Sequence, residues 1–321
     1  MRSDFSRLTF AKFGELRDLT PNGNAHFRGS NCRCISGTEK TEIGAGSGHM
    51  ANDQNHINFV VRGTDDPTVI FVHGFACSLD DWEEQFRSLS PRFRCVAIDL
   101  PGHGNSAKPE TISIEMMGTA VNRVKDRIAA PSTILVGHSM GCRVIIEAFQ
   151  QSGVTVSGLV FVDGSILGCD LQSTMKSTKA AIDRAGMDAF TQQFFSDMIL
   201  ESGNPELRER LIARAQGLNA CFREELFLDV VRWDTTKLRD ALRRISVPAL
   251  VLQSTSMDTD LKRVSLPVGM TTPWMNAVAS LVQKSQARVI PNAGHMTMIE
   301  APQAVNNAIQ QFALMEPDSK Y

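Results

Sequence analysis

A run of nine residues near the middle of the chain, Thr133–Gly141, constrains the fold more than any other feature; it reads TILVGHSMG. Its first four residues are mostly apolar and β-branched, which is typical of a short buried strand. The next five, Gly137–Gly141, fit the pattern G-x-S-x-G, and a helical pattern follows. In this pattern a sharp turn lifts a serine hydroxyl above the end of a parallel sheet, and a Cβ in place of either glycine would clash. The run therefore predicts that Ser139 is a nucleophile.

Strands and helices alternate from about residue 56 onward. Apolar runs predict strands at 56–61, 68–72, 95–99, 133–136, 158–162, 248–252 and 287–290. Apolar residues at helical spacing, such as Ile114, Met117 and Val121, predict helices between them. Continuous apolar strands separated by helices indicate a mostly parallel sheet that is covered on both faces. The predicted fold class is α/β.

Two parts of the chain depart from this alternation. Residues 165–245 show no strand pattern and several amphipathic helical patterns. A crossover between parallel strands needs only about a dozen residues, so the excess predicts a helical cap over the strand ends, where ligands bind in such sheets. Residues 51–164 and 246–321 then form the α/β core. Residues 1–50 are rich in glycine without a sustained apolar period, and we expect a tag-like or disordered arm there.

Two further segments supply what a serine nucleophile needs. A serine hydroxyl is a poor nucleophile at neutral pH unless a base takes its proton. His295 follows the last predicted strand, and Gly294 lets the loop turn sharply, so His295 is the predicted base at the same sheet edge as Ser139. The oxyanion hole needs two backbone N–H groups, which we assign to Met140 and to Phe75 in the loop after strand 68–72. His138, inside the turn, is predicted to point away from the serine.

The acid that orients the base has more than one candidate. One position known for the acid of a Ser-His-acid triad is the end of the strand that follows the serine, and Asp163 is the residue there. The commoner position follows strand 248–252, with the pattern apolar strand, Gly, two residues, Asp. Here the segment reads QSTSMD without that glycine, which leaves Asp258 one residue late and Asp260 as a further candidate. Any of the three carboxylates could orient and charge-balance the imidazolium of His295.

Composition limits the partners and the compartment. The formal net charge of −2 gives no electrostatic reason to bind nucleic acid or an anionic membrane. Seven scattered cysteines argue against a disulfide framework and favour a cytoplasmic location. Cys32 and Cys34 have no partner pair at zinc spacing, so we expect no metal site. The sequence leaves a homodimer open.

With these residues in place, the chain resembles the α/β-hydrolase fold family. The matching landmarks are His73-Gly74, the segment 99–106, the run 137–141, the strand 159–163 and Gly294-His295. The resemblance implies an eight-stranded, mostly parallel sheet, a helical cap, a Ser-His-acid triad and no cofactor. Relatives with an aspartate nucleophile are disfavoured because position 139 is serine.

The expected function is that of a serine esterase. Such an enzyme would cleave carboxylic esters of small to medium apolar or aromatic compounds through an acyl-enzyme. The same fold also supports amide, lactone and carbon–carbon bond hydrolysis, and fold alone does not choose among them. A small-molecule receptor with an intact triad and a cofactor-free oxygenase are the alternatives from other classes.

Overall fold

The computed structural model describes residues 56–200, 203–257 and 263–315. The N-terminal arm expected over residues 1–50 and the alternative acids Asp258 and Asp260 lie outside these ranges. Within them, no helix is both long enough and apolar enough to cross a bilayer.

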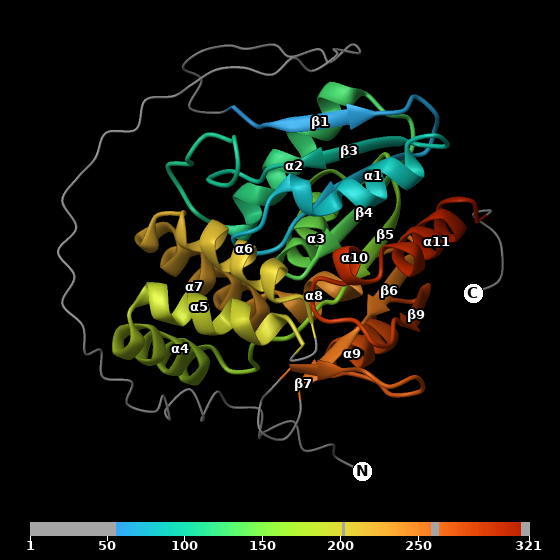
Figure 1. The fold of residues 1–321 in the computed structure, drawn as a ribbon. Coiled ribbons are helices and arrows are strands. Elements are labelled where there is room, and N and C mark those ends of the chain that lie inside the picture. Colours follow the sequence, from blue (N-terminus) through green and yellow to red (C-terminus); the bar gives the residue numbers. More distant parts are fainter. Residues whose placement is uncertain (1–55, 201–202, 258–262, 316–321) are drawn as a thin grey trace.

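The centre of the fold is a single mixed sheet, and it confirms the α/β class (Figure 1). Its order is β1-β3-β2-β4-β5-β6-β9, and only β1 runs antiparallel to its neighbour. The strands are β1 (Phe59–Arg62), β2 (Thr68–Val72), β3 (Arg94–Ile98), β4 (Thr133–His138), β5 (Val156–Val162), β6 (Ala249–Gln253) and β9 (Ser285–Val289). In the described ranges the sheet thus has seven strands, one fewer than the resemblance implied, because residues 56–67 supply one strand before β2.

The register of the parallel strands brings distant segments to one edge. Val72 pairs with Gly137, His138 with Val162, and Val162 with Leu252. Strands β2, β4 and β6 are buried at every position, which explains their uninterrupted apolar sequences. The residues that follow β2, β4, β5 and β6 therefore meet at the carboxyl edge of the sheet, where ligands bind in such folds.

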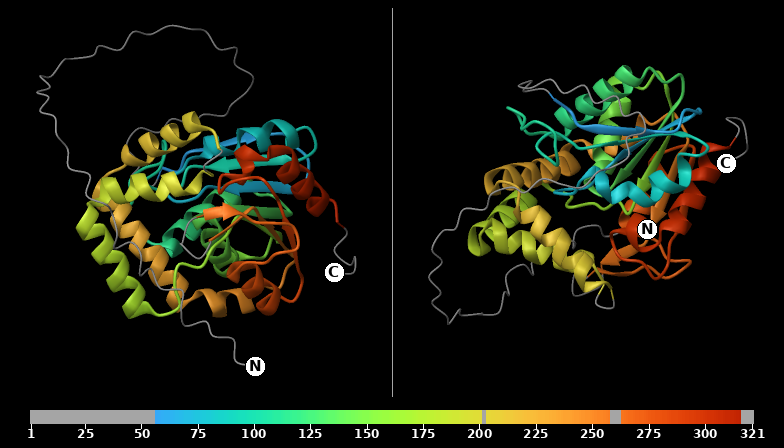
Figure 2. Two further views of the ribbon diagram at one scale, coloured as in Figure 1. Left: turned by 60° about the horizontal axis from the view of Figure 1, so that its bottom comes forward. Right: turned by 45° about the horizontal axis from the view of Figure 1, so that its top comes forward.

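Helices cover both faces of the sheet (Figure 2). On one face α1 packs against α11, and on the other α2 packs against α3 and α3 against α8. The core helices are the short 3-10 turn η1 (Leu79–Trp82), α1 (Glu83–Leu89), α2 (Ile114–Ile128), α3 (Met140–Ser152), α9 (Pro273–Leu281), α10 (Thr297–Glu300) and α11 (Pro302–Ala313).

Five helices lie between β5 and β6 in the chain. They are α4 (Leu171–Ala185), α5 (Met187–Met198), α6 (Pro205–Gln216), α7 (Ala220–Thr236) and α8 (Leu238–Arg243). The first four pack mainly on one another, beyond the carboxyl ends of the strands (Figure 1). The helical pattern of residues 221–244 predicts one helix there, but the structure has two, α7 and α8. Thr235 and Thr236 bond back to the carbonyls of Val231 and Arg232 there, which bends a helix.

A short antiparallel hairpin follows β6 and was not predicted. It pairs β7 (Thr255–Met257) with β8 (Arg263–Ser265). Each strand has three residues, too few for an alternating pattern to stand out in sequence. The hairpin lies beside the carboxyl end of β5 and shapes the site described next.

Candidate active site

Ser139 lies on a strained turn between β4 and α3. Its backbone has φ 52° and ψ −114°, a left-handed conformation that L-residues seldom adopt. A Cβ at Gly137 would lie 2.4 Å from the carbonyl oxygen of Gly141, and one at Gly141 would lie 2.5 Å from that of Val72. The turn therefore needs both glycines of the G-x-S-x-G pattern, because backbone fills the space on either side.

The structure brings Ser139, His295 and Asp163 together from three separate loops. His295 Nε2 lies 2.9 Å from Ser139 Oγ, and His295 Nδ1 lies 2.6 Å from Asp163 Oδ2. Since a carboxylate only accepts, Nδ1 carries the hydrogen and Nε2 is left free to accept from the serine hydroxyl. Asp163 and His295 are buried, and Ser139 is 9% exposed.

The carboxylate of Asp163 is held by the segment that follows β6. Its Oδ1 accepts hydrogen bonds from the backbone N–H groups of Ser254 (2.8 Å) and Thr255 (2.9 Å). Its Oδ2 accepts from the Thr255 hydroxyl at 2.5 Å and lies 3.5 Å from Arg263 Nη1. The strand end at which the sequence suggested the alternative acids thus supplies the donors that fix Asp163.

Burial and charge set the protonation of this pair. Burial raises the pKa of Asp163, but the hydrogen bond and charge of His295, together with Arg263 and Thr255, outweigh it and lower this pKa to about 2. The pKa of His295 falls to about 4, chiefly because burial disfavours the imidazolium and further because Arg263 repels it, while Asp163 opposes the shift. At neutral pH the pair is a carboxylate and a neutral imidazole, which is the state a general base requires.

The predicted oxyanion donors lie beside the serine. Met140 is the first residue of α3, so its N–H has no acceptor within the helix. No acceptor for the Phe75 N–H is found in the part of the chain that the structure describes. Gly74 packs against the serine, since a Cβ there would lie 3.3 Å from Ser139 Cβ. The backbone of this loop is therefore in contact with the serine and carries a free donor.

Two histidines brace these loops. His73 accepts the Leu100 N–H at Nε2 (3.0 Å), so its Nδ1 donates to the Gly74 carbonyl at 2.8 Å. His138 Nε2 lies 2.8 Å from the backbone carbonyl of His295, and the two rings are 4.7 Å apart. The prediction that His138 points away from the serine did not include this contact with the loop of His295, because that loop is 157 positions away in the chain.

A buried ion pair lies behind the serine and was not predicted from the sequence. Arg143 Nε and Nη2 lie 2.7 and 2.6 Å from the two carboxylate oxygens of Asp234, which is on α7. Arg143 Nη1 donates to the Ser139 carbonyl at 3.0 Å, and Nη2 donates to the Ser165 carbonyl at 2.7 Å. An arginine in the apolar first half of α3 was the available signal, since a buried guanidinium needs a carboxylate partner.

Aromatic side chains of α5 and α7 surround the loop that follows β2. The Phe75 ring meets Phe194 and Phe227 edge-on, with centroids 6.0 and 5.4 Å apart, and stacks on Phe195 at 6.5 Å. Phe190 extends the cluster through Phe227, 5.1 Å away. The helices between β5 and β6 thus place a largely buried aromatic cluster next to the predicted oxyanion loop.

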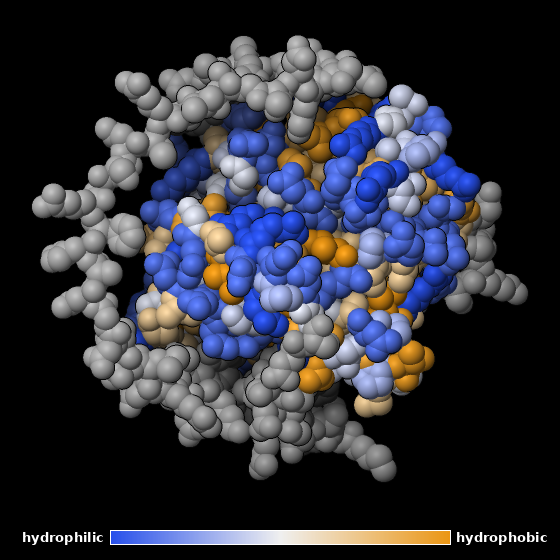
Figure 3. Space-filling view, in the orientation of Figure 1, coloured by the Kyte–Doolittle hydropathy of each residue, from blue (hydrophilic) through white to orange (hydrophobic). Residues whose placement is uncertain are grey.

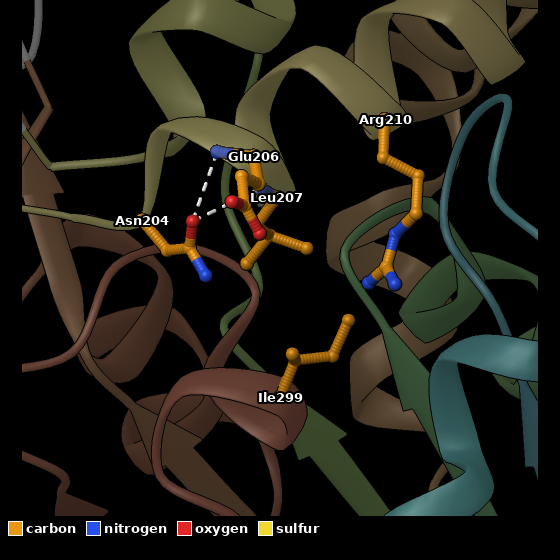
Figure 4. A pocket seen from close by; sticks show the side chains of 5 residues that line it. All are labelled: Asn204, Glu206, Leu207, Arg210 and Ile299. Atoms are coloured by element: carbon orange, nitrogen blue, oxygen red, sulfur yellow. Dashed lines mark hydrogen bonds between the residues drawn. The ribbon is translucent and has the colours of Figure 1, made fainter.

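A separate pocket of about 250 Å³ opens between α6 and α10 (Figure 4). It is lined by Asn204, Glu206, Leu207, Arg210 and Ile299.

In the described ranges, no group of three or more His, Cys, Asp or Glu side chains is placed to bind a metal ion. The surface shown in Figure 3 is mostly hydrophilic, with scattered apolar residues.

Known proteins share this sequence pattern and fold. The chain matches the alpha/beta hydrolase family over residues 69–308. It is 25% identical over 261 residues to a pimeloyl-(acyl-carrier protein) methyl ester esterase of Nitrosomonas europaea, covering 74% of this chain and 92% of that protein. A thermophilic esterase of Thermogutta terrifontis has the same fold, with a TM-score of 0.66, 23% identity, and 80% and 92% of the two chains covered.

Other relatives are longer than this chain. It is 26% identical over 259 residues to the dihydrolipoyllysine-residue acetyltransferase component of the acetoin cleaving system of Pseudomonas putida, covering 79% of this chain. The match spans 65% of the length of that protein and 48% of its Cupriavidus necator counterpart. Because the family match extends over most of the sequence and the fold agrees with it, the chain belongs to the alpha/beta hydrolase family.

Proposed function

We propose that the protein is a serine hydrolase that cleaves carboxylic esters of small to medium apolar or aromatic compounds. The observation that carries the proposal is the hydrogen-bonded series from Ser139 Oγ through both nitrogens of His295 to Asp163, with steps of 2.9 and 2.6 Å. A serine hydroxyl that donates to a neutral, carboxylate-oriented imidazole is an activated nucleophile.

The acylation step follows from this geometry. Ser139 Oγ attacks the ester carbonyl carbon while His295 Nε2 takes the hydroxyl proton. The carbonyl oxygen becomes an oxyanion, which the N–H groups of Phe75 and Met140 stabilise. The bond to the leaving oxygen then breaks, and His295 returns the proton to the departing alcohol, which leaves Ser139 acylated.

The deacylation step uses the same groups with water in place of the alcohol. His295 accepts a proton from a water molecule while the oxygen of that water attacks the acyl carbon. The bond to Ser139 Oγ breaks, the proton passes to that oxygen, and the carboxylic acid leaves. Asp163 stays ionised throughout, holds the imidazole in one tautomer and balances the transient imidazolium.

The substrate class rests on the helices between β5 and β6. We propose that residues 165–245 form a cap over Ser139 and that the aromatic cluster around Phe75 contacts the acyl or alcohol group of the ester. Phe194 is the half-buried member of this cluster, so it is placed to meet a ligand. The similarity to the methyl ester esterase of Nitrosomonas europaea favours ester chemistry.

A panel of p-nitrophenyl esters with increasing acyl length tests the proposal. We expect wild-type protein to hydrolyse them and the Ser139→Ala variant to lose the activity, while Ser280→Ala, on the exposed face of α9, keeps it. A fluorophosphonate should add covalently to wild type and not to Ser139→Ala, as measured by intact mass. Ester hydrolysis that survives in Ser139→Ala, or tight ligand binding by wild type without product release, would exclude the proposed function.

A further inference from the structure

An arginine lies close to the carboxylate of the candidate triad. Arg263 is the first residue of β8, and only 13% of its side chain is exposed. Its Nη1 lies 2.7 Å from Thr255 Oγ1 and 3.5 Å from Asp163 Oδ2. This Oδ2 is also the oxygen that His295 Nδ1 contacts. The guanidinium, the hydroxyl and the imidazole thus converge on one carboxylate oxygen.

We propose that Arg263 is a positioning residue that keeps Asp163 ionised and His295 unprotonated in acidic solution, which extends ester hydrolysis to lower pH. This inference rests on the proposed function, because it concerns the base of that reaction. Arg263 acts through Thr255 and Asp163 and does not touch the substrate.

The hydrogen bonds have a fixed direction. The guanidinium only donates, so Thr255 Oγ1 accepts from Arg263 and its own hydrogen goes to Asp163 Oδ2. The cation is therefore coupled to the carboxylate both directly through space and through a polarised hydroxyl. Asp197, on α5, is a second carboxylate that attracts Arg263. Burial lowers the pKa of Arg263, and the charges of Asp163 and Asp197 oppose this shift. An arginine side chain stays protonated in proteins, so the guanidinium keeps its charge beside the carboxylate.

Other charged groups face His295 from the surrounding elements. Arg143 of α3 also disfavours the imidazolium, but its charge is paired with Asp234. His138 of β4 lies beside the His295 ring and has a pKa lowered to about 3 by burial, so it is neutral. Burial raises the pKa of Glu300 on α10 to about 7, so this group is mostly protonated in acid. Among the described residues, Arg263 is the arginine that also contacts the carboxylate partner of His295.

A positive charge beside the pair favours the carboxylate and disfavours the imidazolium, which lowers both pKa values. Removing that charge should raise both. The acid limb of kcat/KM reports the pKa of the base in the free enzyme, so it should move to higher pH.

The test is the pH profile of kcat/KM for a p-nitrophenyl ester in Arg263 variants. Arg263→Gln can keep the hydrogen bond to Thr255 but lacks the charge, and we expect its acid limb to move up by about 1 pH unit. Arg263→Lys keeps the charge and should stay close to wild type. Arg243→Met, which removes an exposed arginine from α8, is the matched control and should not shift the profile.

A direct titration separates charge from structural damage. In the Ser139→Ala background, the His295 ring signals can be followed by NMR with and without Arg263→Gln, and the His295 pKa should be higher in the double variant. An unchanged or lower pKa, or equal shifts with Gln and Lys, would overturn the inference. If Ser139→Ala kept full activity, the proposed function would fail instead. Should Arg263→Gln not fold, Arg263→Met in the same titration must show the same upward shift.

Discussion

Asp163 Oδ2 lies 2.6 Å from His295 Nδ1, although the two residues are 132 positions apart in the chain. Asp163 follows β5, and Ser139 follows β4, the preceding strand in the chain. Ser254 and Thr255, which follow the neighbouring strand β6, donate the hydrogen bonds that hold this carboxylate. The glycine-containing segment that more commonly supplies the acid is absent from this position. The loop of His295 bridges these strand ends, so one imidazole reaches the serine and the carboxylate together.

Replacing the carboxylate should abolish most of the activity. We expect Asp163→Asn to lower kcat by about 10³- to 10⁴-fold, because the amide would favour the wrong tautomer of His295. The measurement is steady-state hydrolysis of a p-nitrophenyl ester, with circular dichroism to confirm folding. Asp258→Asn and Asp260→Asn are the comparison, and both should retain nearly all activity. A comparable loss in either would reassign the acid.

The loop that follows β2 should tolerate no side chain at Gly74. A Cβ there would lie 2.9 Å from His138 Nδ1 and 3.3 Å from Ser139 Cβ, so Gly74→Ala must push the loop away from the serine. We expect kcat/KM to fall by about 10²-fold through the misplaced Phe75 N–H. In the same loop Ala76 has φ 51°, so the control Ala76→Gly relieves strain and should stay active. Equal activity in both variants would contradict this role of Gly74.

The ion pair behind the serine should couple stability between α3 and α7. Arg143 and Asp234 are both buried, so removing one partner leaves a buried charge unpaired. We expect Arg143→Met to lower the free energy of unfolding by about 3–5 kcal/mol. Urea unfolding of Arg143→Met, Asp234→Leu and the double variant should show that the double variant loses less than the sum of the single losses. Additive losses would show that the two residues act independently.

Stability should fall as the solution becomes acidic. Burial lowers the pKa of His73, His103 and His138 to about 3 and that of His295 to about 4. Below the ordinary histidine pKa of about 6.5 the unfolded chain takes up protons that the native state refuses, so each group costs up to about 1.4 kcal/mol per pH unit. Burial raises the pKa of Glu300 to about 7 and also raises the pKa of Asp229, so these two carboxyls work in the opposite direction, but the four histidines outnumber them.

The check on this pH dependence is urea unfolding at several pH values. The midpoint should drop steadily between about pH 7 and about pH 4, with an unchanged slope m. His103→Gln removes one of the four groups without touching the candidate triad, so it should flatten this dependence. A midpoint that stays constant over the range would show that these histidines are not buried as neutral groups.

Much of the fold could be predicted from local sequence. Strands β2, β4 and β6 were located to within two residues at each end, because each is an uninterrupted apolar run between turn residues. The short hairpin of β7 and β8 was missed, because three-residue strands carry no period. The break between α7 and α8 was missed because the apolar spacing continues through it, while threonine hydroxyls bend the backbone.

The sequence by itself determined the features that depend on neighbouring residues: the alternation of strands and helices, the turn at Ser139 and the loop of His295. Only the tertiary structure decided which carboxylate lies against the imidazole and which buried charges pair. Arg143 and Asp234 are 91 positions apart, and Asp163 and Thr255 are 92 apart. Such partners are set by the register between strands and by the packing of helices over them. No local sequence pattern contains this information, because the same residue fits its own strand or helix whether or not a distant partner lies beside it.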